Sequence, residues 1–206
     1  NHDPSTFEKF VRYAIQVSRN GYRGHLGGSI TLSHALDNER MRHLYTKRFN
    51  GATEKEKIEM LFWKEPQLIE NHIRQHNVSV HDLLKKYPKL KFLLPIRNPL
   101  DCATSNAKLG YTDLFPNVRR NPTVQETVSA ILENLHWFCV LKKAYPTRFF
   151  HFFEYEFSEK TLSQMADFLE IQPDSQWVED SLQAFRMQST YEHDEDLVTH
   201  YREKVK

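Results

Sequence analysis

Arg97 stands where a short apolar run meets a sequence typical of a helix start. The run Phe92–Ile96 has the length and the apolar content of a buried strand. After it, Asn98 is a favourable helix N-cap and Pro99 suits the first helical position. A helix start presents unpaired backbone N–H groups, so both it and the Arg97 guanidinium attract negative charge. The stretch therefore predicts a strand, an arginine, a tight turn and a helix arranged to hold an anion.

The predicted helix has an equally clear end. Lys108 falls in its last turn, where a cation is favourable, and Gly110 follows as a C-cap. Ser105 comes four residues after Asp101, so the two side chains share one face of the helix. We expect one helix between Pro99 and Gly110.

A glycine-rich stretch, residues 21–31, holds four of the six glycines of the chain. Such a concentration requires a backbone reason, either positive φ angles or the close approach of a ligand. Two interpretations stay open. Gly27, Gly28 and Ser29 form a phosphate-binding loop, or the stretch is a surface loop or a turn that gates substrate entry.

Lys64 and Glu65 follow a second short apolar run and precede a proline. A lysine beside a glutamate at the end of a strand can stabilise developing negative charge and accept a proton. The alternative is an ordinary pair of surface charges at a turn. His72 and His25 are further candidates for a catalytic base.

The nine residues from Arg97 to Ser105, RNPLDCATS, resemble the 3′-phosphate-binding motif of sulfotransferases that use 3′-phosphoadenosine 5′-phosphosulfate (PAPS). In that family the first arginine and the last serine of the motif hold the 3′-phosphate. The resemblance therefore implies that Arg97 and Ser105 bind this group here.

Passages on both sides of the motif resemble the same family. YPKLKFLLPIRNP is similar to the lead-in to the motif, and Tyr155 with Glu156 matches a tyrosine–glutamate pair further along. Lys64 matches a Lys-x-Pro stretch that precedes the motif by one helix. The resemblance covers about residues 61–170.

The resemblance implies transfer of the sulfuryl group of PAPS to a hydroxyl or an amine, with PAP as the product. Such an in-line displacement parallels phosphoryl transfer, in which positioning and charge stabilisation supply most of the catalysis. Lys64 would stabilise the bridging oxygen, Glu65 would take the proton of the acceptor, and no metal is required. The 5′-phosphosulfate loop of the family would fall on Gly27, Gly28 and Ser29. If these residues are a surface loop, the true loop would precede Asn1 or be missing.

Strand-like runs at 92–96 and 148–157 alternate with helical patterns. Helices are predicted at 5–19, from residue 80 to before Pro88, and at 123–145, where Thr123 and Glu126 form a capping box. This alternation predicts an α/β fold, a P-loop-like three-layer α/β/α architecture with a mainly parallel central sheet. We expect a single sulfotransferase-like domain over residues 1–206, and its abrupt start at Asn1 suggests a missing N-terminal segment.

Composition narrows the class of partner. The 206 residues carry a net charge of +1, with 39% hydrophobic and 27% charged residues, as in an ordinary globular domain. Nothing in this balance points to nucleic acid, and no apolar run suits an integral membrane segment. The resemblance implies a small-molecule or glycan acceptor. Cys102 and Cys139 form no disulfide or metal pattern, which favours a cytoplasmic protein over a secretory-pathway protein trimmed of its anchor.

Two other functions stay open. The first is a non-catalytic nucleotide-binding domain of the same fold, because Leu26 occupies the position of the basic residue of the family's loop. The second is a P-loop-like phosphotransferase, although the chain has no GxxxxGK[ST] loop. Arg119 and Arg120 are either a solvated pair or contacts to the nucleotide or to an anionic acceptor.

Overall fold

The computed structural model describes residues 4–19, 23–24, 27–28, 37–52, 57–64, 68–112, 115, 118–185 and 191–206. The chain divides into two compact units, Asn1–Lys64 and Glu65–Lys206, and each is described by itself. The expectation of a single domain over the whole chain stays a prediction.

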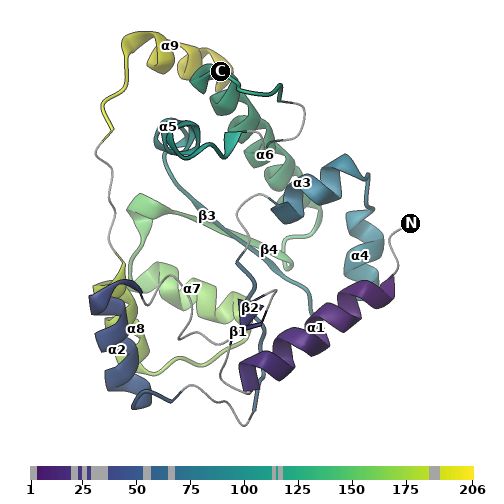
Figure 1. Ribbon diagram of the computed structural model, residues 1–206, viewed down its shortest axis with the longest axis vertical. Helices are drawn as coiled ribbons and strands as arrows, with labels where there is room; N and C mark the ends of the chain where they lie inside the picture. The colour runs from purple at the N-terminus through teal and green to yellow at the C-terminus, as the bar shows by residue number, and fades with distance from the viewer. Residues whose placement is uncertain are drawn as a thin grey trace. The chain divides into compact units, whose positions relative to one another are not determined.

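The first unit contains two helices and a short hairpin, α1 (Pro4–Arg19), β1 (Arg23–Gly24), β2 (Gly27–Gly28) and α2 (Glu39–Phe49) (Figure 1). Helix α1 confirms the predicted helix and buries Ala14 and Val17. Helix α2 begins at Asn38, whose side chain accepts hydrogen bonds from two backbone N–H groups of the first turn.

The second unit is mixed α/β and mostly helical. Its described elements are α3 (Leu68–Gln75), α4 (Val80–Lys86), β3 (Phe92–Ile96), α5 (Pro99–Leu109), α6 (Val124–Ala144), β4 (Phe149–Phe153), η4 (Glu154–Glu156), α7 (Glu159–Leu169), α8 (Ser175–Ala184) and α9 (Glu195–Lys204). The predicted strand at 148–157 is shorter than expected. It gives way to the 3₁₀ turn η4 at Glu154 because the chain must reverse before Ser158, which caps α7.

Strands β3 and β4 form a parallel pair whose register runs from Phe92 opposite Phe149 to Ile96 opposite Phe153. Pro95 is exposed and pairs across from Phe152. A proline has no N–H for a further neighbour, so the open side of β3 is an edge within the part of the chain that the structure describes.

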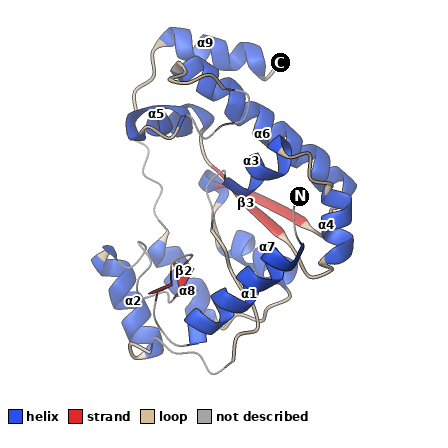
Figure 2. Cartoon of the chain, turned by 45° about the vertical axis from the view of Figure 1, so that its right-hand side comes forward, coloured by secondary structure: helices blue, strands red, loops and turns tan. Residues whose placement is uncertain are grey.

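A helix lies against each face of the two strands, as Figure 2 shows. Phe149 is almost fully buried, stacks on Phe92 with ring centroids 4.7 Å apart, and meets the edge of Phe138 from α6 at 5.3 Å. The next residue of β4, Phe150, points to the other face and stacks on Phe168 of α7 at 5.3 Å. The buried aromatic rings therefore fix the position of the strand ends.

A second core joins α5, α6 and α9. Leu100, Ala103, Val128 and Leu197 are buried in it, and α9 lies beside the other two helices in Figure 1. Burying these side chains holds the start of α5 in place from the side opposite the strands.

Candidate functional site

The junction between β3 and α5 has the predicted arrangement. The strand ends at Ile96, Arg97 follows, and the Asn98 side chain accepts a hydrogen bond from the backbone N–H of Leu100 at 3.0 Å. Pro99 is the first helical residue, and the helix closes at Gly110 with φ of 71°. The predicted strand, N-cap, helix and C-cap are all confirmed.

The Arg97 side chain is 43% exposed and forms one ion pair within the second unit. Its Nε donates to Oε2 of Glu154 at 3.1 Å. Glu154 is the first residue after β4, and parallel strands in register bring their carboxyl ends to the same edge. This is why two residues far apart in sequence meet here.

The electrostatics of the junction follow from partial burial. Burial lowers the pKa of Arg97, but the hydrogen bond and the charge of Glu154 raise it by more, so the guanidinium stays charged. The Cys102 thiol has a raised pKa because it is largely buried, although the charge of Arg97 opposes this. The raised pKa favours the protonated thiol of Cys102.

The ion pair with Glu154 uses only one of the hydrogen-bonding nitrogens of Arg97. A guanidinium has five N–H donors, and the Glu154 carboxylate engages only Nε. Among the residues that the structure describes, Nη1 and Nη2 of Arg97 have no hydrogen-bond partner. Both could bind two oxygens of a phosphate at the start of α5.

Ser105 is half-buried on α5, on the same continuous segment as Arg97. Asp101, on the same helix, is 3% exposed and accepts a hydrogen bond from Nε2 of His193 at 2.7 Å. Arg97 and Ser105 thus lie on one strand–helix segment, with Arg97 before the N-cap and Ser105 within α5.

Two residues of this junction, Glu154 and His193, were not predicted as part of it. Glu154 could have been inferred, since it follows the second strand and the carboxyl ends of parallel strands meet. His193 has no local signal, because its partner Asp101 lies 92 residues earlier in the chain.

The glycine stretch has a different local structure from a phosphate loop. Gly27 and Gly28 form β2, which pairs antiparallel with β1 after helix α1. A phosphate loop follows a strand and opens a helix. The hairpin therefore favours the alternative of a surface loop or gating turn. Ser29 and His25 lie outside the described residues.

Among the remaining predicted residues, Lys64 is exposed and ends the first unit, whereas Glu65 lies outside the described residues. His72 is exposed on α3, with its ring centroid 4.5 Å from that of His76. Lys64 and Arg97 belong to different units, so the roles of Lys64 and Glu65 stay predictions.

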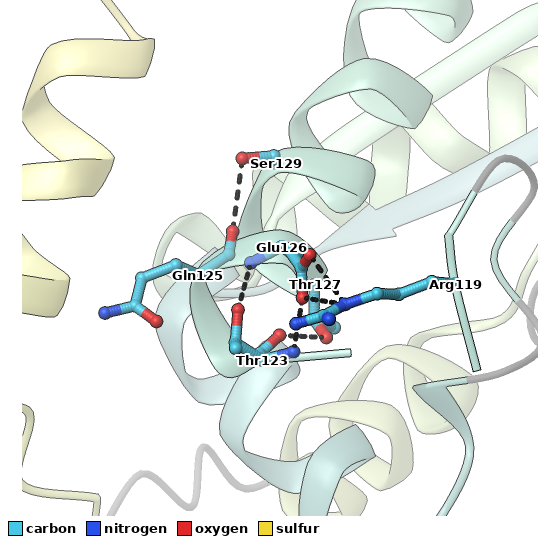
Figure 3. Close-up of polar contacts among 6 residues, drawn as sticks. All are labelled: Arg119, Thr123, Gln125, Glu126, Thr127 and Ser129. Atoms are coloured by element: carbon cyan, nitrogen blue, oxygen red, sulfur yellow. Dashed lines mark hydrogen bonds and ion pairs between the residues drawn. The ribbon is translucent and has the colours of Figure 1, made fainter. Parts of the chain in front are cut away.

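Arg119 is bound at the start of α6 (Figure 3). Its Nε lies 2.9 Å from Oε1 of Glu126, whose carboxylate also accepts the backbone N–H of Thr123. The Thr123 hydroxyl in turn accepts a hydrogen bond from the backbone N–H of Glu126, which completes the predicted capping box. The Thr123 N–H is the main reason that the pKa of Glu126 is lowered. Arg119 is largely exposed, as a solvated residue would be.

A second polar cluster joins α3 to α6. Nη1 of Arg74 donates to Oδ1 of Asn134 and lies 4.0 Å from Glu70, and Nη2 lies 3.7 Å from Glu133. Burial raises the pKa of Glu70 to about 7, against the opposing charge of Arg74. A shallow cavity of about 390 Å³ adjoins the cluster and is lined by Ile73, Arg74, Asn77, Val78, Val80 and Trp137.

Comparisons of the chain with protein-family models, with curated proteins and with solved structures found no match. Among the helices that the structure describes, none has the length and apolar character of a membrane crossing. The described side chains contain no group of three or more His, Cys, Asp or Glu placed to hold a metal ion.

Proposed function

We propose that the chain is a PAPS-dependent sulfotransferase on a P-loop-like three-layer α/β/α fold with a mainly parallel central sheet. The observation that carries the proposal is the position of Arg97. It lies at the carboxyl end of β3, beside the capped start of α5, with Nη1 and Nη2 unengaged by any described residue. A guanidinium next to a helix N-terminus is well suited to a phosphate dianion.

The local context of the RNPLDCATS stretch supports PAPS as the ligand. A short motif carries weight only in the structural setting that its chemistry needs, here a strand, a tight turn and a helix. Residues 92–110 have that setting, with Arg97 in the turn and Ser105 two turns into α5. Together these two residues would hold the 3′-phosphate, the group that distinguishes PAPS from ATP.

In the proposed reaction, the acceptor oxygen or nitrogen bonds to the sulfur as the bond from sulfur to the bridging oxygen of PAPS breaks. Lys64 would stabilise the negative charge that develops on the leaving PAP. Glu65 would take the proton of the acceptor, which we expect to be a small molecule or a glycan.

The Glu154 carboxylate is compatible with an anion on Arg97 only because it uses Nε and leaves the Nη pair. It nevertheless places a negative charge beside the incoming phosphate, which weakens binding. The charge of Glu154 would therefore limit the affinity of Arg97 for a phosphate.

Titration calorimetry with PAP, ATP and AMP tests the proposal. We expect PAP to bind more tightly than ATP and AMP, and Arg97→Ala to weaken PAP roughly hundredfold because it removes charge-assisted hydrogen bonds to the phosphate. Ser105→Ala removes one neutral donor, with a loss of roughly fivefold.

Arg119→Ala is the matched control, because Arg119 also stands before a helix start and binds a glutamate through Nε. We expect its PAP affinity to stay within about twofold of the wild type, since surface pairs contribute little. Equal affinity for ATP and PAP, or an Arg97→Ala protein that binds PAP normally, would reject the 3′-phosphate site.

A non-catalytic nucleotide-binding domain is the second candidate, favoured by the antiparallel hairpin that contains Gly27 and Gly28. A transfer assay with labelled PAPS separates the two functions. Transfer that is lost in Lys64→Ala with PAP affinity retained supports the enzyme. PAP binding without transfer to any hydroxyl or amine acceptor, and without release of sulfate, supports the binder.

A further inference from the structure

The C-terminal segment, residues 191–206, lies along α5. At its start, the Tyr191 ring lies 4.4 Å from Nζ of Lys108 in the last turn of α5. Two residues later, His193 bonds Asp101 in the first turn, and Leu197 is then buried against Leu100. The segment thus contacts both ends of the helix that begins at the proposed phosphate site.

The contact between His193 and Asp101 is shielded from water, since their side chains are 11% and 3% exposed. An ionised carboxylate only accepts hydrogen bonds, so Nε2 of His193 carries the proton that is shared with it. Nδ1 of His193 is buried and has no hydrogen-bond partner among the described residues. The bond to Asp101 is therefore the only polar contact that the structure gives the His193 ring.

Asp101 also acts on Arg97. It follows Arg97 by four residues, in the first turn of α5, and its negative charge makes the smallest of the contributions that raise the pKa of the guanidinium, after those of Glu154 and Cys102. Arg97 is thus paired with Glu154, and the charge of Asp101, four residues later in the chain, acts on it as well. The hydrogen bond from His193 is what offsets the charge of Asp101.

We propose that His193 is a positioning residue for the phosphate site and acts through Asp101, an inference that rests on the proposed function. With His193 in place, Asp101 is satisfied and Arg97 keeps its Nη groups for the ligand. Without it, a buried carboxylate is left without its partner, which is costly. Arg97 then turns toward Asp101 and is withdrawn from the 3′-phosphate.

His200 supplies the matched control. It lies on the same segment, is also partly buried, and makes one hydrogen bond, in which Nε2 lies 3.0 Å from Oγ of Ser129 on α6. That bond ties α9 to α6, away from Arg97. His200→Ala therefore reports the cost of loosening the segment alone.

The experiment measures PAP affinity of the whole chain for the wild type and five variants, with thermal unfolding of each. We expect His193→Ala to raise Kd for PAP roughly tenfold, within the usual range of coupling between sites. His193→Gln restores most of the affinity, because its amide can donate to Asp101 from a similar distance. His200→Ala stays within about twofold of the wild type.

The double variant tests whether His193 acts through Asp101. Asp101→Asn carries no charge and does not attract Arg97, so we expect the His193→Ala effect on Kd to disappear in this background. An effect of unchanged size there overturns the proposal. Equal losses in His193→Ala and His200→Ala do the same, as does a His193→Gln protein that is no better than His193→Ala.

The outcomes also separate this inference from the proposed function. If the wild type does not bind PAP, the proposed function fails and the role of His193 fails with it. If the wild type binds PAP and the His193 variants bind it equally well, only the role of His193 is wrong. Should His193→Ala not fold, His193→Phe, which also lacks a donor for Asp101, replaces it: a roughly tenfold loss of affinity supports the proposal, and wild-type affinity overturns it.

Discussion

Arg74 and Arg97 both lie beside a glutamate in the second unit, but they use their donors differently. Arg74 is 18% exposed; its Nη1 donates to Asn134 and lies 4.0 Å from Glu70, and its Nη2 lies 3.7 Å from Glu133. Arg97 is 43% exposed and uses only Nε. The Arg74 guanidinium joins α3 to α6, whereas Nη1 and Nη2 of Arg97 have no partner among the described residues.

The difference shows how to separate a structural arginine from a binding one. A guanidinium that satisfies buried acceptors holds the fold together, because its loss leaves those acceptors unpaired. A half-exposed guanidinium at a strand end can be removed at little cost to folding, and under our proposal its role is to bind a ligand. We therefore expect Arg74→Ala to lower stability with little effect on PAP affinity, and Arg97→Ala to lower PAP affinity with little effect on stability.

The largest expected effect is on the stability of Arg74→Ala. The change leaves Asn134 and Glu70 without their cationic partner, and we expect a loss of about 3 kcal/mol in the free energy of unfolding, measured in urea. Its PAP affinity, measured under folding conditions, should match the wild type.

Arg97→Ala provides the reverse case, with a stability change within about 1 kcal/mol. An Arg74→Ala protein as stable as the wild type would show that the α3–α6 cluster contributes little. An Arg97→Ala protein destabilised by as much would make Arg97 a structural residue as well.

Glu70→Gln should change how stability depends on pH. Burial raises the pKa of Glu70 to about 7 in the folded protein, whereas an unfolded glutamate titrates near 4.5. The folded state binds the extra proton between these values, so the wild type loses stability as pH rises from about 4.5 to 7. Glutamine has no such proton, and we expect the variant to be more stable than the wild type by about 1–3 kcal/mol at pH 8.

The same comparison at pH 4 should show nearly equal stabilities, because Glu70 is then protonated in both states. Urea unfolding at the two pH values is the measurement. A difference of the same size at both would assign the effect to packing, not to ionisation.

Arg97→Lys tests whether PAP binding needs the planar guanidinium or only its positive charge. Lysine keeps the charge but cannot bind Glu154 and two phosphate oxygens at once, so we expect roughly tenfold weaker PAP binding by calorimetry. The variant should therefore fall between the wild type and Arg97→Ala. An affinity equal to that of the wild type would mean that only the charge matters.

Glu154→Gln should have the smallest effect, and in the opposite direction. It removes the carboxylate that lies 3.1 Å from Nε of Arg97, and with it the repulsion of an incoming phosphate. We expect PAP to bind roughly threefold more tightly, by the scale of one partly screened charge. Weaker binding would show that Glu154 orients Arg97 for the ligand and does not compete with it.

Local chemistry made the centre of this fold predictable from sequence. Asn98, Pro99 and Gly110 set the ends of α5, and Thr123 sets the start of α6, because a cap depends only on residues a few positions away. The strand at 92–96 was equally clear from its apolar run. These signals sufficed to locate Arg97 between a strand and a helix.

What joins distant segments was not predictable in the same way. The bond from His193 to Asp101 depends on how α9 packs on α5, and no local pattern encodes that packing. The strand predicted at 148–157 ran past Glu154 because aromatic residues continue after the strand ends. Gly27 and Gly28 were compatible by composition with a phosphate loop and with a surface loop or gating turn, and tertiary context decides between them.

The parallel pairing of β3 and β4 has a consequence for the order of folding. Everything from Arg97 to Arg148, including α5 and α6, must be looped out before the two strands can pair. Closing such a long loop costs entropy before any strand contact repays it, so pairing follows helix formation. Arg97 and Glu154 lie at the end of this pairing, which makes their meeting a late event. A nascent chain therefore acquires the ion pair only once residues up to Glu154 have been synthesised and β4 has docked.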